Sequence, residues 1–140
     1  MGQARDVMDR MTTLTVEARD VDAAAECYAD NAVVVTPDAG EVRGREQIAD
    51  YWRHFIDAFS DSHFDSLGKH ETGNAAIDEG YFTGTNTAPM KMPTGDTLPA
   101  TGKHVRVRSC DIATVENGKI IEHHLYFDQA DFLGQLGLAP

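Results

Sequence analysis

The sequence predicts an α+β protein whose sheet is largely antiparallel. Helical patterns dominate the first part of the chain, and β-rich segments separated by turn residues follow them. The two patterns do not alternate, as they would in a protein built from parallel βαβ units. Asn117-Gly118, between two β-rich segments, is the strongest turn signal in the chain and predicts a hairpin.

Length and composition indicate one ordinary domain over residues 1–140. Apolar residues make up 41% of the chain, which is enough for a packed core. The net charge of −11 leaves no basic surplus for a phosphate backbone or an anionic membrane surface, so we expect neither nucleic acid nor membrane as a partner. The chain shows no signal peptide and no transmembrane pattern. Cys27 and Cys110 fit buried thiols, and we expect a cytoplasmic protein.

Three helices are expected before the main strands. The first covers roughly residues 3–19, and Asp20 or Asp22 caps a short second helix that runs through Tyr28. The third begins at Gly44 and is strongly amphipathic. Its apolar positions are Ile48, Tyr51, Trp52, Phe55 and Phe59.

The strands follow from β-branched and alternating segments. A first strand at Ala32–Thr36 is stopped by Pro37, and a brief one follows at Val42 and Arg43. The segment 87–101 contains three prolines, which predicts a long loop outside the main sheet. The remaining elements are strands at about 63–72, 75–87, 101–116 and 119–128, then a short helix at 129–136.

Three stretches resemble the NTF2-like superfamily, and within it the SnoaL-like polyketide or ester cyclase group. They are YADNA at 28–32, VRGREQI at 42–48, and GKIIEH at 118–123 with YFD and QLG behind it. The resemblance implies a cone: three N-terminal helices packed on a strongly curved mixed or antiparallel sheet that encloses an apolar pocket. It also implies a homodimer and a hydrophobic small-molecule ligand.

Asp111 and His123 are the candidate catalytic pair. If Glu116-Asn117-Gly118 form a three-residue loop, Asp111 faces His123 across the hairpin; a two-residue Asn117-Gly118 turn instead pairs Asp111 with His124. We favour the first register, because the resemblance places His123 on the inner face. A carboxylate and an imidazole in an apolar pocket titrate together and can exchange a proton with a substrate.

The resemblance also shows departures from characterised members. The basic Asp of the ketosteroid isomerases falls at Thr36, and their oxyanion-binding Tyr at about Thr12. The acid/base Asp of aromatic polyketide cyclases falls at Leu125. The threonine and leucine side chains at these positions do not take over the roles of the Asp and Tyr residues that they replace. Any catalysis therefore falls to Asp111 and His123.

The pocket wall is expected to come from aromatic and inner-strand residues. Trp52 is the favoured wall residue because the third helix closes the cone in the family, although its apolar neighbours also suit an ordinary core. Tyr28 is either a core residue with a satisfied hydroxyl or a proton donor. The full set of expected substrate-binding residues is Tyr28, Trp52, Phe55, Ser109, Leu125 and Phe127.

No pattern in the chain predicts a metal or cofactor. The six histidines show no ligand spacing, and the chain contains neither a Gly-rich phosphate loop nor a GxSxG motif. The favoured function is a cyclase or isomerase that applies acid/base chemistry to a hydrophobic carbonyl compound. Two alternatives stay open: a non-catalytic small-molecule-binding domain, and an epoxide or ester hydrolase in which Asp111 activates water.

Overall fold

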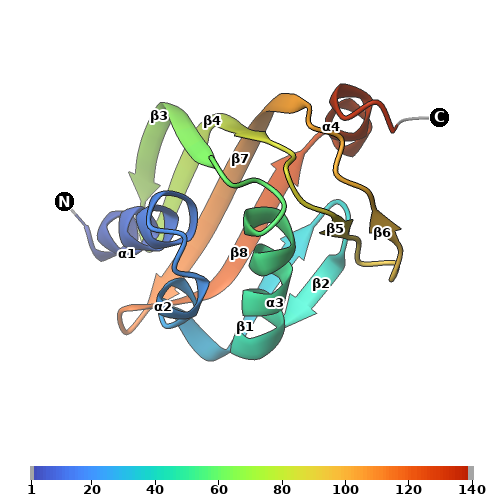
Figure 1. Cartoon of the computed structure of the whole chain (residues 1–140). Coiled ribbons are helices and arrows are strands. Elements are labelled where there is room, and N and C mark those ends of the chain that lie inside the picture. The colour runs from blue at the N-terminus through green and yellow to red at the C-terminus, as the bar shows by residue number, and fades with distance from the viewer. Residues whose placement is uncertain (1, 139–140) are drawn as a thin grey trace.

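Helices lie against one side of a mixed six-stranded sheet in the computed structural model, which describes residues 2–138 (Figure 1). The expected α+β class is confirmed. Within the described residues there are four α-helices and one π-helical segment. They are α1 Gln3–Thr12, the π-helix η1 Thr13–Glu17, α2 Val21–Ala25, α3 Arg45–Ile56 and α4 Gln129–Gln135.

The strand order of the large sheet is β2-β1-β8-β7-β4-β3. The β1–β8 pair is parallel and the other pairs are antiparallel. The expectation of strong curvature is wrong, since the sheet is not strongly curled (Figure 1). Its strands are β1 Tyr28–Thr36, β2 Gly40–Arg43, β3 His63–Thr72, β4 Ala75–Thr85, β7 His104–Glu116 and β8 Lys119–Phe127.

Two local expectations need correction. Tyr28 begins β1 instead of ending the second helix, because it pairs with Ile120 of β8 and the carbonyl of Cys27 accepts a hydrogen bond from the Ile120 amide. The 87–101 loop contains a small hairpin of its own, formed by β5 Met90–Lys91 and β6 Thr97–Leu98. Buried Asn86 anchors both ends of this segment through hydrogen bonds to Ala88 and Thr101.

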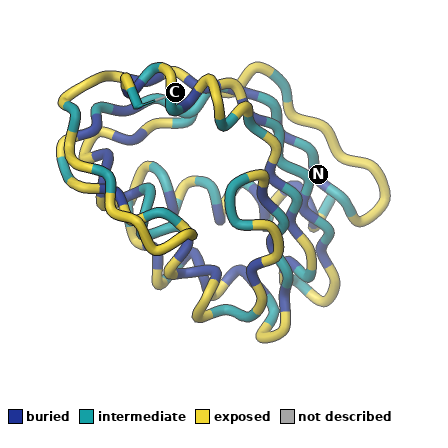
Figure 2. The backbone as a smooth tube through the Cα atoms, turned by 90° about the vertical axis from the view of Figure 1, so that its right-hand side faces the viewer, coloured by how far each residue is buried: buried dark blue, intermediate teal, exposed yellow. Residues whose placement is uncertain are grey.

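The core lies between the helices and the inner face of the sheet. Met8 of α1 and Ile48 of α3 are fully buried there, together with Ile120 of β8. Buried and exposed positions alternate along the strands, which is the pattern of a sheet with one covered face (Figure 2). No helix among the described residues is long and apolar enough to cross a bilayer.

The β7–β8 hairpin does not have the favoured register. Asn117 and Gly118, both with positive φ, form a two-residue turn, and Glu116 pairs with Lys119. A bulge between Thr114 and Val115 then shifts the ladder by one residue, so that the Cα partner of Asp111 is Leu125. His123 is therefore a diagonal neighbour of Asp111 on the same face, within reach of a long side chain.

Candidate active site

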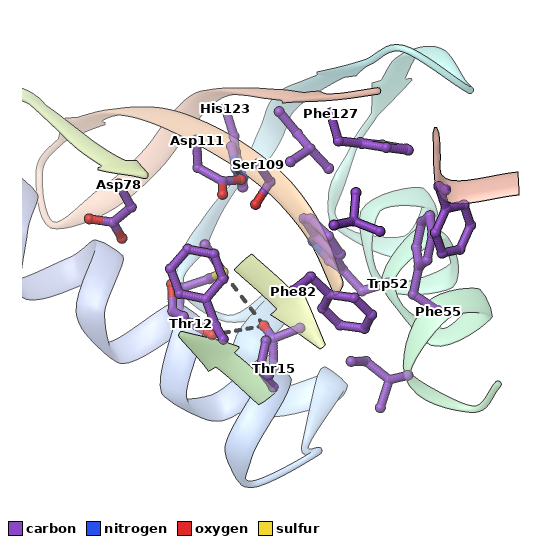
Figure 3. A pocket seen from close by; sticks show the side chains of 17 residues that line it. Thr12, Thr15, Trp52, Phe55, Asp78, Phe82, Ser109, Asp111, His123 and Phe127 are labelled. Carbon is purple, nitrogen blue, oxygen red and sulfur yellow. Dashed lines mark hydrogen bonds and ion pairs between the residues drawn. The ribbon is translucent and has the colours of Figure 1, made fainter. Parts of the chain in front are cut away.

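One cavity of about 100 Å³ opens between the sheet, the N-terminal helices and α3. Six of its 17 lining residues are aromatic: Trp52, Phe55, Phe64, Phe82, Phe127 and Phe132. Asp78, Ser109, Asp111 and His123 lie on the sheet side at one end, whereas Thr12 and Thr15 lie on the opposite wall (Figure 3). The cavity is thus a largely apolar chamber with a concentrated polar end, the form typical of small-molecule sites.

Asp111, His123 and Tyr28 form a chain of hydrogen bonds at this polar end. The Nε2 atom of His123 lies 2.7 Å from Oδ1 of Asp111, and its Nδ1 atom lies 2.8 Å from the Tyr28 hydroxyl oxygen. The side chain of His123 is 1% exposed, whereas that of Asp111 is 15% exposed. Both residues line the cavity, and Asp111 is the more exposed of the two.

The environment of Tyr28 favours one direction for these hydrogen bonds. Burial raises the pKa of the Tyr28 hydroxyl far above its ordinary value, so the hydroxyl keeps its proton. It can then donate to Nδ1 of His123. A neutral His123 with its proton on Nε2 donates in turn to the Asp111 carboxylate. This assignment satisfies both ring nitrogens and leaves Asp111 as an ionised carboxylate.

Asp78 places a second carboxyl group at the same end of the cavity (Figure 3). It is the Cα partner of Asp111 across the β4–β7 ladder and is only 2% exposed. Burial raises the pKa of Asp78, the nearby Arg5 guanidinium opposes this, and the charge of Asp111 adds to the rise. Within residues 2–138, Oδ1 of Asp78 has no hydrogen-bond partner.

Arg5 lies behind Asp78, on α1. Its Nη2 atom is 2.5 Å from Oδ1 of Asp78, a close ion pair without the geometry of a hydrogen bond. The same guanidinium donates to Oδ1 of Asp9 and to the carbonyls of His70 and Ile77. Arg5 is thus shared between two carboxylates, Asp9 and Asp78.

The π-helical segment shapes the wall opposite the sheet. Thr12, Thr15 and Val16, at and next to this segment, line the cavity. The Thr15 hydroxyl donates to the Met11 carbonyl at 2.7 Å, so it is already satisfied within the helix. π-Helical turns occur often at functional sites, where they redirect side chains.

The structure brings most of the expected site residues together. Trp52, Phe55, Ser109, Leu125 and Phe127 all line the cavity with Asp111 and His123, whereas Tyr28 lies behind His123 and does not line it. Sequence reasoning missed Asp78. A signal for it was present, because Ala76, Asp78 and Phe82 follow the alternation of one strand face.

The mixed sheet with helices over one face has the fold of the ketosteroid isomerase-like, NTF2-like class of α+β proteins, which two solved structures at 15% identity share. Within that class the chain belongs to the SnoaL-like domain family, whose model matches residues 8–123. No curated protein matches the chain in sequence.

Solved structures share the fold over nearly the whole chain. A candidate SnoaL-like polyketide cyclase from Jannaschia sp. CCS1 has a TM-score of 0.84 at 17% identity, covering 99% of this chain and 94% of its own. IdmH, a candidate polyketide cyclase from Streptomyces antibioticus, has a TM-score of 0.78 at 24% identity, with 97% and 99% covered. AclR, a candidate hydroxylase from Streptomyces galilaeus, has a TM-score of 0.80 at 17% identity, with 98% and 97% covered. Identities this low establish the fold alone.

Proposed function

We propose that this protein is an acid/base enzyme that removes a proton next to the carbonyl of a hydrophobic small molecule, as a cyclase or isomerase does. The observation that carries the proposal is the 2.7 Å contact between Asp111 and His123 at the polar end of an aromatic cavity. Asp111 is the proton acceptor. His123 is a positioning residue that holds the carboxylate and shares its proton.

The geometry gives each group a distinct task. Oδ1 of Asp111 is bound by His123, so its orientation is fixed, while the partly exposed side chain still meets the cavity. A base must lie within hydrogen-bond reach of the proton that it abstracts, and an apolar chamber strengthens its electrostatic interactions. The aromatic walls at the other end suit the carbon skeleton of the substrate.

The names of two neighbours point the same way. The proteins from Jannaschia and Streptomyces antibioticus are both named as candidate polyketide cyclases. Ring closure by an aldol reaction starts with removal of a proton α to a carbonyl, the step assigned here to Asp111. The sequence position at which characterised cyclases carry their Asp holds Leu125 here, so the base reaches the cavity from the neighbouring strand β7.

The test is the exchange of α-protons for deuterium in 1-phenylpropan-2-one, a one-ring ketone, followed by proton NMR in D₂O. We expect the wild type to accelerate exchange and Asp111→Asn to slow it by about 100-fold or more, the usual contribution of a general base. Glu122→Gln is the matched control, because Glu122 precedes His123 on β8 and its exposed side chain pairs with His124.

Two results would contradict the proposal. One is an exchange rate in Asp111→Asn equal to that of the wild type. The other is a wild-type rate no higher than that of buffer while the ketone is shown to bind, which would favour a binding domain without catalysis.

A further inference from the structure

Two carboxyl groups lie on adjacent strands at the polar end of the cavity, whose other lining residues are mostly apolar and include six aromatic side chains. Asp78 and Asp111 are Cα partners on adjacent antiparallel strands, so their Cβ atoms lie about 5 Å apart. Both line the cavity (Figure 3). Two ionised carboxylates at this separation in an apolar chamber repel each other, and a bound positive charge relieves that repulsion.

The nearby positive charges do not fully neutralise Asp78 and Asp111. Arg5 contacts both Asp78 and Asp9, and Lys69 contacts Asp9. Three carboxylates, Asp9, Asp78 and Asp111, therefore meet two cations when His123 is neutral. One negative charge stays uncompensated, and no Lys or Arg stands among the described residues that line the cavity.

Asp78 already has one cationic partner. It is only 2% exposed, and its buried Oδ1 atom lies 2.5 Å from Nη2 of Arg5 without the geometry of a hydrogen bond. Because Arg5 is shared with Asp9, a ligand cation beside Asp78 and Asp111 adds a charge-assisted contact on the side of the carboxyl pair that lines the cavity. The aromatic rings nearby favour a cation as well, because their faces carry negative charge.

We infer that the cavity takes a hydrophobic ligand with a positively charged nitrogen, and that Asp78 and Asp111 together hold this charge. The inference rests on the proposed function, since it names the substrate class of the same site: a hydrophobic carbonyl compound with a protonated amine. A neutral ligand of equal size fills the aromatic end but leaves the excess negative charge of the two carboxylates uncompensated.

The experiment compares three one-ring probes that differ in charge: benzylammonium, benzyl alcohol and benzoate. The probes carry no more than one aromatic ring, because the cavity, at about 100 Å³, is smaller than the cavity of about 150 Å³ that holds benzene. Isothermal titration calorimetry on the wild type at pH 7 is expected to show benzylammonium binding about tenfold or more tightly than benzyl alcohol, as a charge-assisted hydrogen bond implies. Benzoate is expected to bind most weakly.

Two variants assign the preference to the carboxyl groups. Asp78→Asn and Asp111→Asn should each weaken benzylammonium binding by about tenfold while changing benzyl alcohol binding by less than about threefold. Glu79→Gln removes the same charge one residue away, where the side chain pairs with the exposed Arg108, and should change neither. Circular dichroism spectra that match the wild type establish that each variant is folded.

The inference is overturned if benzyl alcohol or benzoate binds the wild type as tightly as benzylammonium, or if no probe binds at millimolar concentration. Both readouts use the wild type and do not depend on the folding of a variant. If the protein accelerates proton exchange in neutral 1-phenylpropan-2-one but does not prefer benzylammonium, only this inference fails and the proposed function stands. A preference for the cation without any exchange removes the proposed catalysis and leaves a binding site for hydrophobic amines.

Discussion

The hydroxyl oxygen of Tyr28 lies 2.8 Å from Nδ1 of His123, on the side of the imidazole opposite Asp111. Tyr28 is the first residue of β1, and the parallel pairing of β1 with β8 brings it beside His123. Both residues are completely buried. The hydroxyl therefore satisfies a nitrogen that no water reaches, and it fixes the ring that in turn orients Asp111.

Replacement of Tyr28 by Phe should destabilise the protein. The change leaves Nδ1 of His123 buried without a partner, and we expect the free energy of unfolding to fall by about 1–3 kcal/mol. Urea denaturation followed by tryptophan fluorescence measures this. Tyr126→Phe is a matched control, because Tyr126 contacts Nδ1 of His124 at the exposed face, where the loss should stay within about 0.5 kcal/mol. Equal losses in the two variants would refute a special role for the buried contact.

The stability of the protein should depend on pH with opposite signs at two carboxyl groups. The pKa of Asp78 is raised, with burial as the largest cause, so its folded form binds a proton more readily than its unfolded form. Its contribution therefore becomes less favourable as the pH rises from about 4 through the raised value. The free energy of unfolding of Asp78→Asn, relative to the wild type, should rise with pH over this range.

Asp9 should show the reverse trend. Burial acts to raise its pKa, but hydrogen bonds from Lys69 and Arg5 outweigh this and lower it below the ordinary value. Its ionised form stabilises the folded state above about pH 4, and that contribution disappears as the pH falls through the lowered pKa. The free energy of unfolding of Asp9→Asn, relative to the wild type, should therefore fall as the pH rises. Urea unfolding between pH 3 and 7 tests both signs, and parallel curves for the two variants would contradict them.

Replacement of Asn86 by Ala should loosen the segment beyond β4. The Asn86 amide donates to the carbonyls of Ala58 and Ala88, and its oxygen accepts from the backbone and hydroxyl of Thr101. Because Asn86 is 1% exposed, its loss leaves several buried groups unpaired, and we expect a cost of about 3 kcal/mol. Hydrogen exchange should accelerate at the Thr101 amide. Asn31→Ala, on the exposed part of β1, is the control and should cost less than about 0.5 kcal/mol.

Local sequence patterns were sufficient for most elements, but not for the register that brings Asp111 and His123 into contact. The strand His63–Thr72 and the amphipathic helix that carries Trp52 follow directly from period and turn residues. The contact between Asp111 and His123 was expected for the wrong reason. The two-residue turn alone would pair Asp111 with His124. A bulge in β8 shifts the ladder by one further residue, and no sequence pattern predicts that bulge.

The missing parts of the site depend on contacts between distant segments. Asp78 is buried because Arg5, 73 positions earlier in the chain, pairs with it on the folded structure. Tyr28 takes a place behind His123 because β1 adds to the sheet next to β8, in parallel. The local sequence predicts a helix through Tyr28 and therefore does not predict its place in β1. In the folded protein, strand pairing outweighs the local helix propensity.

The protonation of the His123 imidazole tests the central claim most directly, because the proposed base requires a particular proton position. Nitrogen-15 NMR of the histidine side chains at pH 7, with His123 assigned from the His123→Gln spectrum, reports which ring nitrogen carries hydrogen. The account predicts a protonated Nε2 that donates to an ionised Asp111 and an Nδ1 that accepts from Tyr28. An unprotonated Nε2 would contradict it, because Asp111 would then hold the shared proton and could not act as the base.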